Sequence, residues 1–368
     1  MSGLVIECVN CGSRYPDSAL PYLCPQCGGV YDLAVPLVYD PALFDSNLPG
    51  IWRFNATMGI PYNNKISLGE GNTPLLWSKI DGRKIAFKCE DLNPTGSFKD
   101  RGSAVLISWF RQHQIREIVE DSSGNAGASL SAYAARAEIR AKIYIPASTS
   151  GPKKCQIEAY GAEVVSVPGL RIAAAEAARA ATNSDIPYAS HSYLPFNIPG
   201  YATIAYELLE QMEEPPKTVI LPAGQGGLLL GIYRGFEAAC RSGFCKAMPQ
   251  IIAVQAKECA PLWIRFVSGK EEFDAGSGNT TIAEGISIRH PVRCAAVMRA
   301  IRDCSGRVVV VDEVDILTGR DMLAQKGLYV EPTSAVVWYA IQQLTDECLD
   351  PVVVILTGSG YKYSHSGI

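Results

Sequence analysis

The sequence lacks any long hydrophobic run and any excess of positive charge. No apolar stretch in its 368 residues approaches the roughly 20 residues that a membrane-spanning helix needs, and no apolar segment follows a basic start as in a secretory leader. The net charge at pH 7 is -4, so the composition gives no general attraction for nucleic acid or an anionic membrane. We therefore expect a cytoplasmic protein that binds neither.

Histidine is scarce, and the cysteines are not distributed as in a secreted disulfide scaffold. The 4 histidines are isolated from one another and from the cysteines, so we assign none of them to a mechanism. Four of the 12 cysteines form two CxxC pairs, and the others are scattered through helix-like and strand-like segments. This distribution favours a metal site with free thiols over disulfides. With 48% hydrophobic and 19% charged residues, the chain is globular and long enough for two domains.

Two short cysteine turns near the N-terminus predict a zinc site. Each turn is a cysteine pair followed by glycine: Cys8, Cys11 and Gly12, then Cys24, Cys27 and Gly28. Four thiolates fill a tetrahedral site and leave no position for a substrate, so we expect the zinc to be structural. Residues 1–35 are too few to form a stable hydrophobic core without such a metal ion. Arg14 is their only cation, which argues against a nucleic-acid-binding ribbon.

The segment Asn93–Gly102 joins a strand-like run, Lys84–Cys89, to a helix-like run, Gly102–Phe110. Proline and glycine within the segment interrupt regular structure, so the helix begins close to Lys99. At that place the helix dipole and burial both favour a neutral amine. A neutral amine is a nucleophile, which is the state that a Schiff-base lysine needs.

Beyond Lys99, strand-like and helix-like segments alternate along the chain. The strand-like segments are 115–120, 141–145, 163–167, 218–221 and 352–356, and the helix-like segments are 128–137, 153–160, 172–182 and 228–240. Such alternation predicts a parallel, doubly wound sheet with helices on both faces. Ligands bind at the carboxyl ends of the strands in sheets of this kind.

Three loops at predicted strand ends contain small residues that let the backbone approach a ligand. Ser122–Gly127 opens a helix, so its amides and serine hydroxyls suit a carboxylate, and Asn125 can reach a phenolic oxygen. The backbone amides of Gly224–Gly227 suit a phosphate without a cationic side chain. In Thr357–Gly360 a hydroxyl can face a ring nitrogen. Taken singly, the first and third loops are also what an ordinary capped turn looks like.

The glycine turn at Gly224–Gly227 matches neither of two common nucleotide-binding patterns. Leu228 and Leu229 stand where the phosphate loop needs lysine and a hydroxyl residue, and glycine is absent from position 229, where GxGxxG needs it. A nucleotide is therefore not the ligand that this turn predicts.

Together and in this order, the four motifs resemble the pyridoxal-phosphate enzymes of fold type II, the tryptophan synthase β family. The resemblance covers about residues 67–368, and the ribbon with Gly69–Leu76 and Pro146–Gly169 makes the chain most similar to the threonine synthases. It implies two three-layer α/β domains of that fold. We expect a zinc ribbon at 1–35, a wrapping linker at 36–66, a domain at 84–195 with the lysine and serine loop, and a domain of 67–83 with 196–368 carrying the phosphate loop.

The resemblance implies a role for each matched residue. Lys99 would bind pyridoxal 5′-phosphate as a Schiff base and move the Cα proton. The other cofactor-binding residues would be Asn125 at the ring hydroxyl, Gly224, Gln225, Gly226 and Gly227 at the phosphate, and Thr357 at the ring nitrogen. The substrate carboxylate would meet Ser122, Ser123, Gly124, Ala126 and Gly127. A hydroxyl cannot keep the ring nitrogen protonated as a carboxylate would, which favours elimination and replacement chemistry. Ala283–Ile286 is expected beside the cofactor ring.

Threonine synthases convert O-phosphohomoserine and water into threonine and phosphate, so their substrate needs a second anion site. The candidates are Lys153, Lys154, Arg289 and Arg293, and we choose Arg289 because it closely follows Glu284-Gly285-Ile286. Two departures from the family pattern leave the substrate open. Ala126 replaces a hydroxyl residue after the asparagine, and Gln225 and Gly227 replace asparagines in the phosphate loop.

Two alternatives therefore stand beside a threonine synthase. One is another enzyme of this fold acting on serine, phosphoserine or cysteine derivatives, such as an ammonia-lyase or a cysteine or cysteate synthase. The other is a ribbon-tethered binding protein with an inactive cofactor fold, which a colourless purified protein would support. Because the family is commonly dimeric, we expect a homodimer with a small amino-acid substrate.

Overall fold

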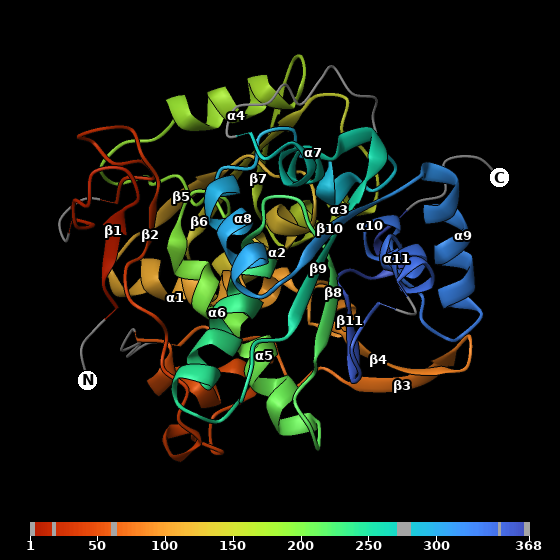
Figure 1. Ribbon diagram of the computed structural model, residues 1–368. Helices are drawn as coiled ribbons and strands as arrows, with labels where there is room; N and C mark the ends of the chain where they lie inside the picture. Colours follow the sequence, from red (N-terminus) through yellow and green to blue (C-terminus); the bar gives the residue numbers. More distant parts are fainter. Residues whose placement is uncertain (1–3, 17–19, 60–64, 271–280, 345–346, 364–368) are drawn as a thin grey trace. The chain divides into compact units, whose positions relative to one another are not determined.

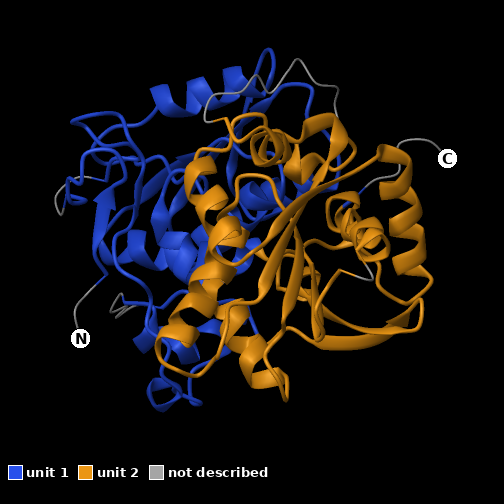
Figure 2. Cartoon of the chain, viewed as in Figure 1, with its two compact units in different colours: residues 1–71, 99–201, 363–368 blue, residues 72–98, 202–362 orange. Residues whose placement is uncertain are grey.

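The computed structural model describes residues 4–16, 20–59, 65–270, 281–344 and 347–363 (Figure 1). Parts of the predicted ribbon, linker and C-terminal half lie outside these ranges. The chain forms two compact units (Figure 2): unit 1 is residues 1–71, 99–201 and 363–368, and unit 2 is residues 72–98 and 202–362. The predicted α/β class is confirmed, whereas the domain boundaries stay predictions. Among the described residues, no helix combines the length and hydropathy of a membrane span.

Unit 1 contains a parallel three-stranded sheet in the order β5-β6-β7. Its strands are β5 (Glu117–Glu120), β6 (Arg140–Pro146) and β7 (Glu163–Val167), and its helices are α1 (Lys99–Gln112), α2 (Asn125–Arg136), α3 (Pro152–Ala159) and α4 (Arg171–Ala180). Helix α1 is buried continuously from Asp100 to Phe110, as its apolar sequence predicts. A hydrogen bond of 2.6 Å from Ser129 Oγ to Asp100 Oδ1 ties α2 to α1.

The ribbon and the linker belong to unit 1. Their regular elements are β1 (Ile6–Cys8) and β2 (Tyr31–Leu33), which pair antiparallel, and short 3-10 helices at Pro41–Leu43 and Gly50–Thr57. Trp52 and Phe54 are both 0% exposed, so both side chains are packed in the protein interior. The Trp52 indole N–H donates to the carbonyl of Ile66 at 3.2 Å, so its polar atom is satisfied inside the core.

Unit 2 contains a six-stranded sheet in the order β10-β9-β8-β11-β4-β3. The strands are β3 (Leu75–Ile80), β4 (Arg83–Cys89), β8 (Thr218–Pro222), β9 (Gln250–Ala256), β10 (Arg307–Val311) and β11 (Val352–Leu356). All neighbours are parallel except β3 and β4. The helices are α6 (Gly227–Arg241), α7 (Pro261–Ser268), α8 (Cys294–Asp303), α9 (Glu313–Ala324), α10 (Pro332–Ala335) and α11 (Val337–Gln343), while α5 (Ile198–Gln211) carries the chain from unit 1 to unit 2.

Strands β4, β11 and β8 of unit 2 end at the same edge of their sheet. Leu356 is opposite Cys89, and Val354 is opposite Ile220, two residues before the end of β8. The loops that follow these three strands therefore begin side by side at the carboxyl edge, where parallel sheets bind ligands. They are the segment that leads to Lys99, the Thr357–Gly360 turn and the glycine turn before α6.

Candidate active site

Lys99 is the first residue of α1, in the first helical turn as predicted. Its side chain lines a small cavity in unit 1 together with Glu120, Ala126 and His191. Burial lowers the pKa of Lys99 to about 8, while the carboxylate charge of Glu120 opposes this shift and the charge of Arg171 reinforces it. The amine can therefore lose its proton close to neutral pH, which is the property that a nucleophilic lysine needs.

The serine loop lies in the same unit and reaches the same cavity through Ala126. Helix α2 begins at Asn125, three residues before the predicted start, so part of the loop forms its first turn. A Cβ at Gly127 would lie 1.9 Å from the carbonyl oxygen of Ser122, so glycine is required for the loop to close this tightly. The backbone N–H groups of Ser123, Ala126 and Gly127 find no backbone acceptor within the described ranges. This helix start therefore offers donors to an anion.

The glycine turn lies in unit 2, between β8 and α6. Gly226 has a φ of +86°, and a Cβ there would lie 2.2 Å from Val297 Cγ2. A Cβ at Gly224 would lie 3.1 Å from the carbonyl oxygen of Gly285. Within the described chain, the backbone N–H groups of residues 224–227 donate to no backbone acceptor. A cradle of amides in which three of four residues are glycine, at the start of a long helix, fits a phosphate group.

Thr357 directly follows β11 in unit 2 and is held by its backbone. Its N–H donates to Ser334 Oγ at 2.7 Å, and its carbonyl accepts from the N–H of Phe98, the residue before Lys99, at 3.1 Å. Its Oγ1 is buried and has no hydrogen-bond partner in the part of the chain that the structure describes. Because an unpaired buried hydroxyl costs free energy, this atom fits a polar ring atom of a ligand.

The segment expected beside the cofactor ring packs against the glycine turn within unit 2. Besides the close approach of Gly285 to Gly224, the N–H of Gly285 donates to Thr333 Oγ1 at 3.0 Å. The side chain of Gln225 is used structurally, because its Oε1 accepts from the N–H of Val292 at 3.1 Å. Glycine at position 285 also leaves space, since a Cβ there would crowd the Thr333 side chain at 3.0 Å.

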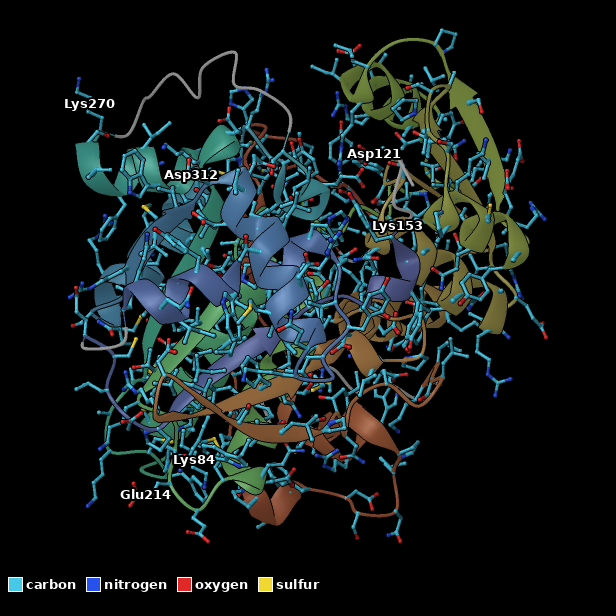
Figure 3. All side chains as sticks on the ribbon, turned by 90° about the vertical axis from the view of Figure 1, so that its right-hand side faces the viewer. Lys84, Asp121, Lys153, Glu214, Lys270 and Asp312 are labelled. Atoms are coloured by element: carbon cyan, nitrogen blue, oxygen red, sulfur yellow. The ribbon has the colours of Figure 1, made fainter. Side chains whose placement is uncertain are left out.

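The four candidates for a second anion site are divided between the units. Lys153 (labelled in Figure 3) and Lys154 lie in the first turn of α3 of unit 1, and Lys154 Nζ lies 4.0 Å from a Glu158 carboxylate oxygen. Arg289 is exposed on the segment that follows Ile286 in unit 2, and Arg293 is buried at the start of α8. Exposure leaves Arg289 accessible to a ligand, but its assignment stays a prediction.

Four thiols converge in the ribbon. The sulfur atoms of Cys8, Cys11, Cys24 and Cys27 all lie within 4.8 Å of one another. Two of the separations are 3.4 Å and 3.7 Å, close to the roughly 3.8 Å that a tetrahedral zinc with bonds of about 2.3 Å would impose. Gly12 and Gly28 have φ of +73° and +70°, and their N–H groups turn back to the carbonyls of Cys8 and Cys24. The four sulfur donors and the backbone turns at the two glycines therefore both fit a zinc ion.

Two polar residues beside Lys99 were not singled out from the sequence. His191 Nδ1 lies 3.0 Å from Glu120 Oε1, and Glu120 is only 1% exposed. The histidines are isolated along the chain, so sequence spacing gives no reason to choose His191; His365 lies outside the described residues. The one available signal was a pair of acids, Glu120 and Asp121 (the latter labelled in Figure 3), at the end of β5, directly after Ile118 and Val119.

Comparisons with known proteins agree with this arrangement. A sequence model of the family described as "Pyridoxal-phosphate dependent enzyme" matches residues 66–358. The threonine synthase of Methanosarcina acetivorans is 29% identical, covering 96% of this chain and 91% of its own. The threonine synthase of Bacillus sp. (strain ULM1) is 32% identical, covering 82% and 87%.

Among solved structures, maize serine racemase has a TM-score of 0.68 at 25% identity, covering 80% of this chain and 90% of its own. A fungal L-serine ammonia-lyase from Rhizomucor miehei has a TM-score of 0.69 at 23% identity, covering 79% and 94%. The sequence matches and these structures confirm the resemblance and the fold type predicted from the four motifs.

Proposed function

Because the chain belongs to the family of pyridoxal-phosphate-dependent enzymes, we propose that it is a threonine synthase-like lyase that converts O-phosphohomoserine and water into threonine and phosphate. The observation that carries this proposal is the match to a protein named threonine synthase over 96% of the chain. Because it covers 96% of the chain, the match includes part of the cysteine ribbon as well as the two α/β domains. A cytoplasmic location and a homodimer are part of the same proposal.

The residues present fit the cofactor. The Thr357 hydroxyl, buried with no partner among the described residues, suits the ring nitrogen, and the amides of Gly224–Gly227 suit the phosphate. Asn125 is assigned to the ring hydroxyl, and the amine of Lys99 is assigned to the aldehyde. When bound, pyridoxal phosphate supplies an electron sink that makes the Cα proton of an amino acid acidic.

The chain's own residues would bind the substrate and move its protons. We assign the substrate carboxylate to the helix-start amides of α2 and the hydroxyls of Ser122 and Ser123. An amine whose pKa is about 8 both accepts and donates protons near neutral pH, so Lys99 Nζ is assigned the transfer of the Cα proton. Arg289, exposed and always positively charged, is assigned the substrate phosphate. Zinc on the four cysteines would hold the ribbon together.

One specific observation favours a second candidate function. Ala126 lines the Lys99 cavity in place of a hydroxyl residue, which reduces the polar contacts available to a phosphorylated substrate there. Elimination or replacement on serine or cysteine derivatives, as in an ammonia-lyase or a cysteine or cysteate synthase, would tolerate a small apolar wall. The fold is shared with proteins described as a serine racemase and an L-serine ammonia-lyase.

The deciding experiment compares products from different substrates. The purified protein is expected to show the visible absorbance of bound pyridoxal phosphate, and the Lys99→Ala variant is expected to lose it. With O-phosphohomoserine we expect equal amounts of phosphate and threonine. Keto-acid formation from serine without phosphate release from O-phosphohomoserine would favour the second candidate. A colourless wild-type protein that does not take up added cofactor would refute both and leave an inactive binding protein.

A further inference from the structure

We propose that Glu120 and His191 form an uncharged, hydrogen-bonded pair that positions Lys99 and allows its amine to lose its proton. The pair lies in unit 1, at the end of β5 and in the loop before α5. The inference deepens the proposed function, and it rests on that function only in assigning the cofactor to Lys99. Both residues are positioning residues, because they act on the reaction through the lysine.

Geometry places the pair directly beside the lysine. Lys99, Glu120 and His191 line one small cavity. Glu120 Oε1 lies 3.0 Å from His191 Nδ1, and Glu120 Oε2 is buried with no hydrogen-bond partner in the described part of the chain. A buried carboxylate with an oxygen that lacks a hydrogen-bond partner is costly, whereas a neutral carboxylic acid keeps its proton and donates its O–H to the imidazole nitrogen.

Further hydrogen bonds hold His191 in place. The side chain of Asn197 donates to the carbonyl of His191 at 2.6 Å, and Ser192 Oγ lies 3.3 Å from His191 Nε2. Asn197 and Tyr201 line the same cavity from the chain segment that begins α5. Contacts to both ring nitrogens and to the backbone carbonyl fix the orientation of the imidazole. Nδ1 therefore faces the carboxyl group of Glu120.

The surrounding charges favour the uncharged form of the pair. Burial, reinforced by Asp121, raises the pKa of Glu120 well above its usual range, although the cations Arg171 and Lys99 oppose this. Burial, reinforced by Lys99 and Arg171, lowers the pKa of His191 well below its usual range. The titratable and charged groups that face the pair are Lys99 from α1, Asp121, Tyr188, whose hydroxyl lies 2.5 Å from Asp121 Oδ1, Arg171 from α4 and Tyr201 from α5.

The charge state of Glu120 has a direct consequence for Lys99. An ionised Glu120 would hold the lysine as an ammonium ion, since its charge raises the lysine pKa. A neutral acid that donates to His191 removes this attraction and still fills the wall of the cavity. The pair would thus keep the amine available for covalent attachment of the cofactor and for later proton transfer.

The test measures how fast cofactor-free protein regains visible absorbance with added pyridoxal phosphate as a function of pH. Glu120→Gln keeps a neutral group that can donate to Nδ1, so the midpoint of the pH profile is expected to move by less than about half a unit. Glu120→Leu removes the donor and is expected to slow uptake about tenfold. His113→Gln, at an exposed histidine outside the cavity, is the matched control and should change neither quantity.

A midpoint lowered by about one unit or more in Glu120→Gln would overturn the proposal, because it would show that an ionised Glu120 stabilises the ammonium form of Lys99. Imidazole NMR on the cofactor-free protein gives a second readout, with the His191 signals identified by their loss in His191→Gln. We expect His191 to stay neutral from about pH 5.5 to about pH 8. A protonated His191 in that range would also overturn the proposal. If wild-type protein takes up no cofactor, the proposed function fails, and the NMR result still decides the charge of the pair.

Discussion

Burial of one lysine gives the chain a reactive amine and also lowers its stability. The pKa of Lys99 falls from its usual 10.5 to about 8 in the folded protein, whereas the unfolded chain keeps the usual value. Between these two values the unfolded chain binds a proton that the folded chain does not bind. The free energy of unfolding therefore rises with pH across this window, and the full cost is present below it.

Lys99→Met should remove this cost from the cofactor-free protein. We expect a higher free energy of unfolding in urea at about pH 7, and a weaker rise in stability between about pH 8 and about pH 10.5. Lys246→Met, at an exposed lysine of unit 2, is the control and should leave the pH dependence as in the wild type. If the free energy of unfolding of Lys99→Met rises with pH as steeply as that of the wild type, the lysine is solvated in the folded protein.

Thr357 can be tested with substitutions that separate shape from hydrogen bonding. Thr357→Val keeps the volume and removes the hydroxyl that has no partner among the described residues, and Thr357→Ser keeps the hydroxyl. If this hydroxyl bonds the cofactor ring, valine should weaken cofactor affinity about fivefold, as expected for one hydrogen bond, and serine much less. Titration of cofactor-free protein with pyridoxal phosphate measures both. Equal affinities for the two variants would contradict the assignment.

At the scale of a single element, helix α6 offers a controlled test of its N-terminal turn. Gly226 and Gly243 flank this helix, and both have positive φ, +86° and +78°. The Cβ of an alanine at Gly243 would lie in open space, so Gly243→Ala should lower the free energy of unfolding by about 1 kcal/mol through its backbone conformation alone. Alanine at Gly226 also meets Val297 at 2.2 Å, so its cost should be larger by about 1–3 kcal/mol.

Urea unfolding gives these two stabilities, and cofactor titration shows which change reaches the ligand. Only Gly226→Ala is expected to weaken cofactor binding, because only this glycine belongs to the turn whose amides are assigned to the phosphate. Equal stability costs would show that Val297 moves aside without penalty, and unchanged cofactor affinity would argue against the phosphate assignment.

The regular elements were predictable where burial leaves a simple mark in the sequence. Strand β11 was predicted with the bounds that it has, because a strand buried on both faces reads as an unbroken apolar run, here Val352–Leu356. Helix α2 begins at Asn125, earlier than predicted, since its first turn is made of small loop-like residues. The 3-10 helix at Gly50–Thr57 was missed because it lies in a proline-containing stretch without clear periodicity.

The candidate site was predictable only in its separate pieces. Ligands in parallel sheets lie at strand ends, so residues such as Thr357 could be chosen by position, and their roles stay predictions. Pairings between distant residues could not be predicted from one sequence. Glu120 and His191 are 71 residues apart, and neither lies in a pattern that points to the other. Their hydrogen bond depends on the tertiary arrangement of unit 1.

For the molecule as a whole, the ribbon is joined to the interior of unit 1 through aromatic rings. Tyr15 makes edge contacts with Tyr31, Phe196 and Trp109, with ring centroids 4.7, 5.1 and 5.9 Å apart. Trp109 in turn stacks on Phe196 at 3.8 Å. A change in the ribbon should therefore alter the surroundings of a tryptophan in helix α1.

Removal of zinc by a chelator is expected to unfold the ribbon and change the fluorescence of Trp109, identified by its loss in Trp109→Phe. Cys8→Ser should lower the metal content from one zinc per chain and lower the melting temperature. Cys155→Ser, at an exposed cysteine outside the cluster, should do neither. Protein that contains no metal when purified, and whose fluorescence ignores the chelator, would contradict the zinc assignment.

The pairing of β4 with β11 has a consequence for biosynthesis. Ile85 is opposite Val352, so this apolar strand leaves the ribosome long before its neighbour has been translated. At about 5–20 residues per second, the 266 intervening residues take roughly 13–50 seconds. During that interval the nascent strand can pair only with its antiparallel neighbour β3 and lacks its parallel partner β11, so segment 83–89 is where a chaperone that shields apolar chain would be needed.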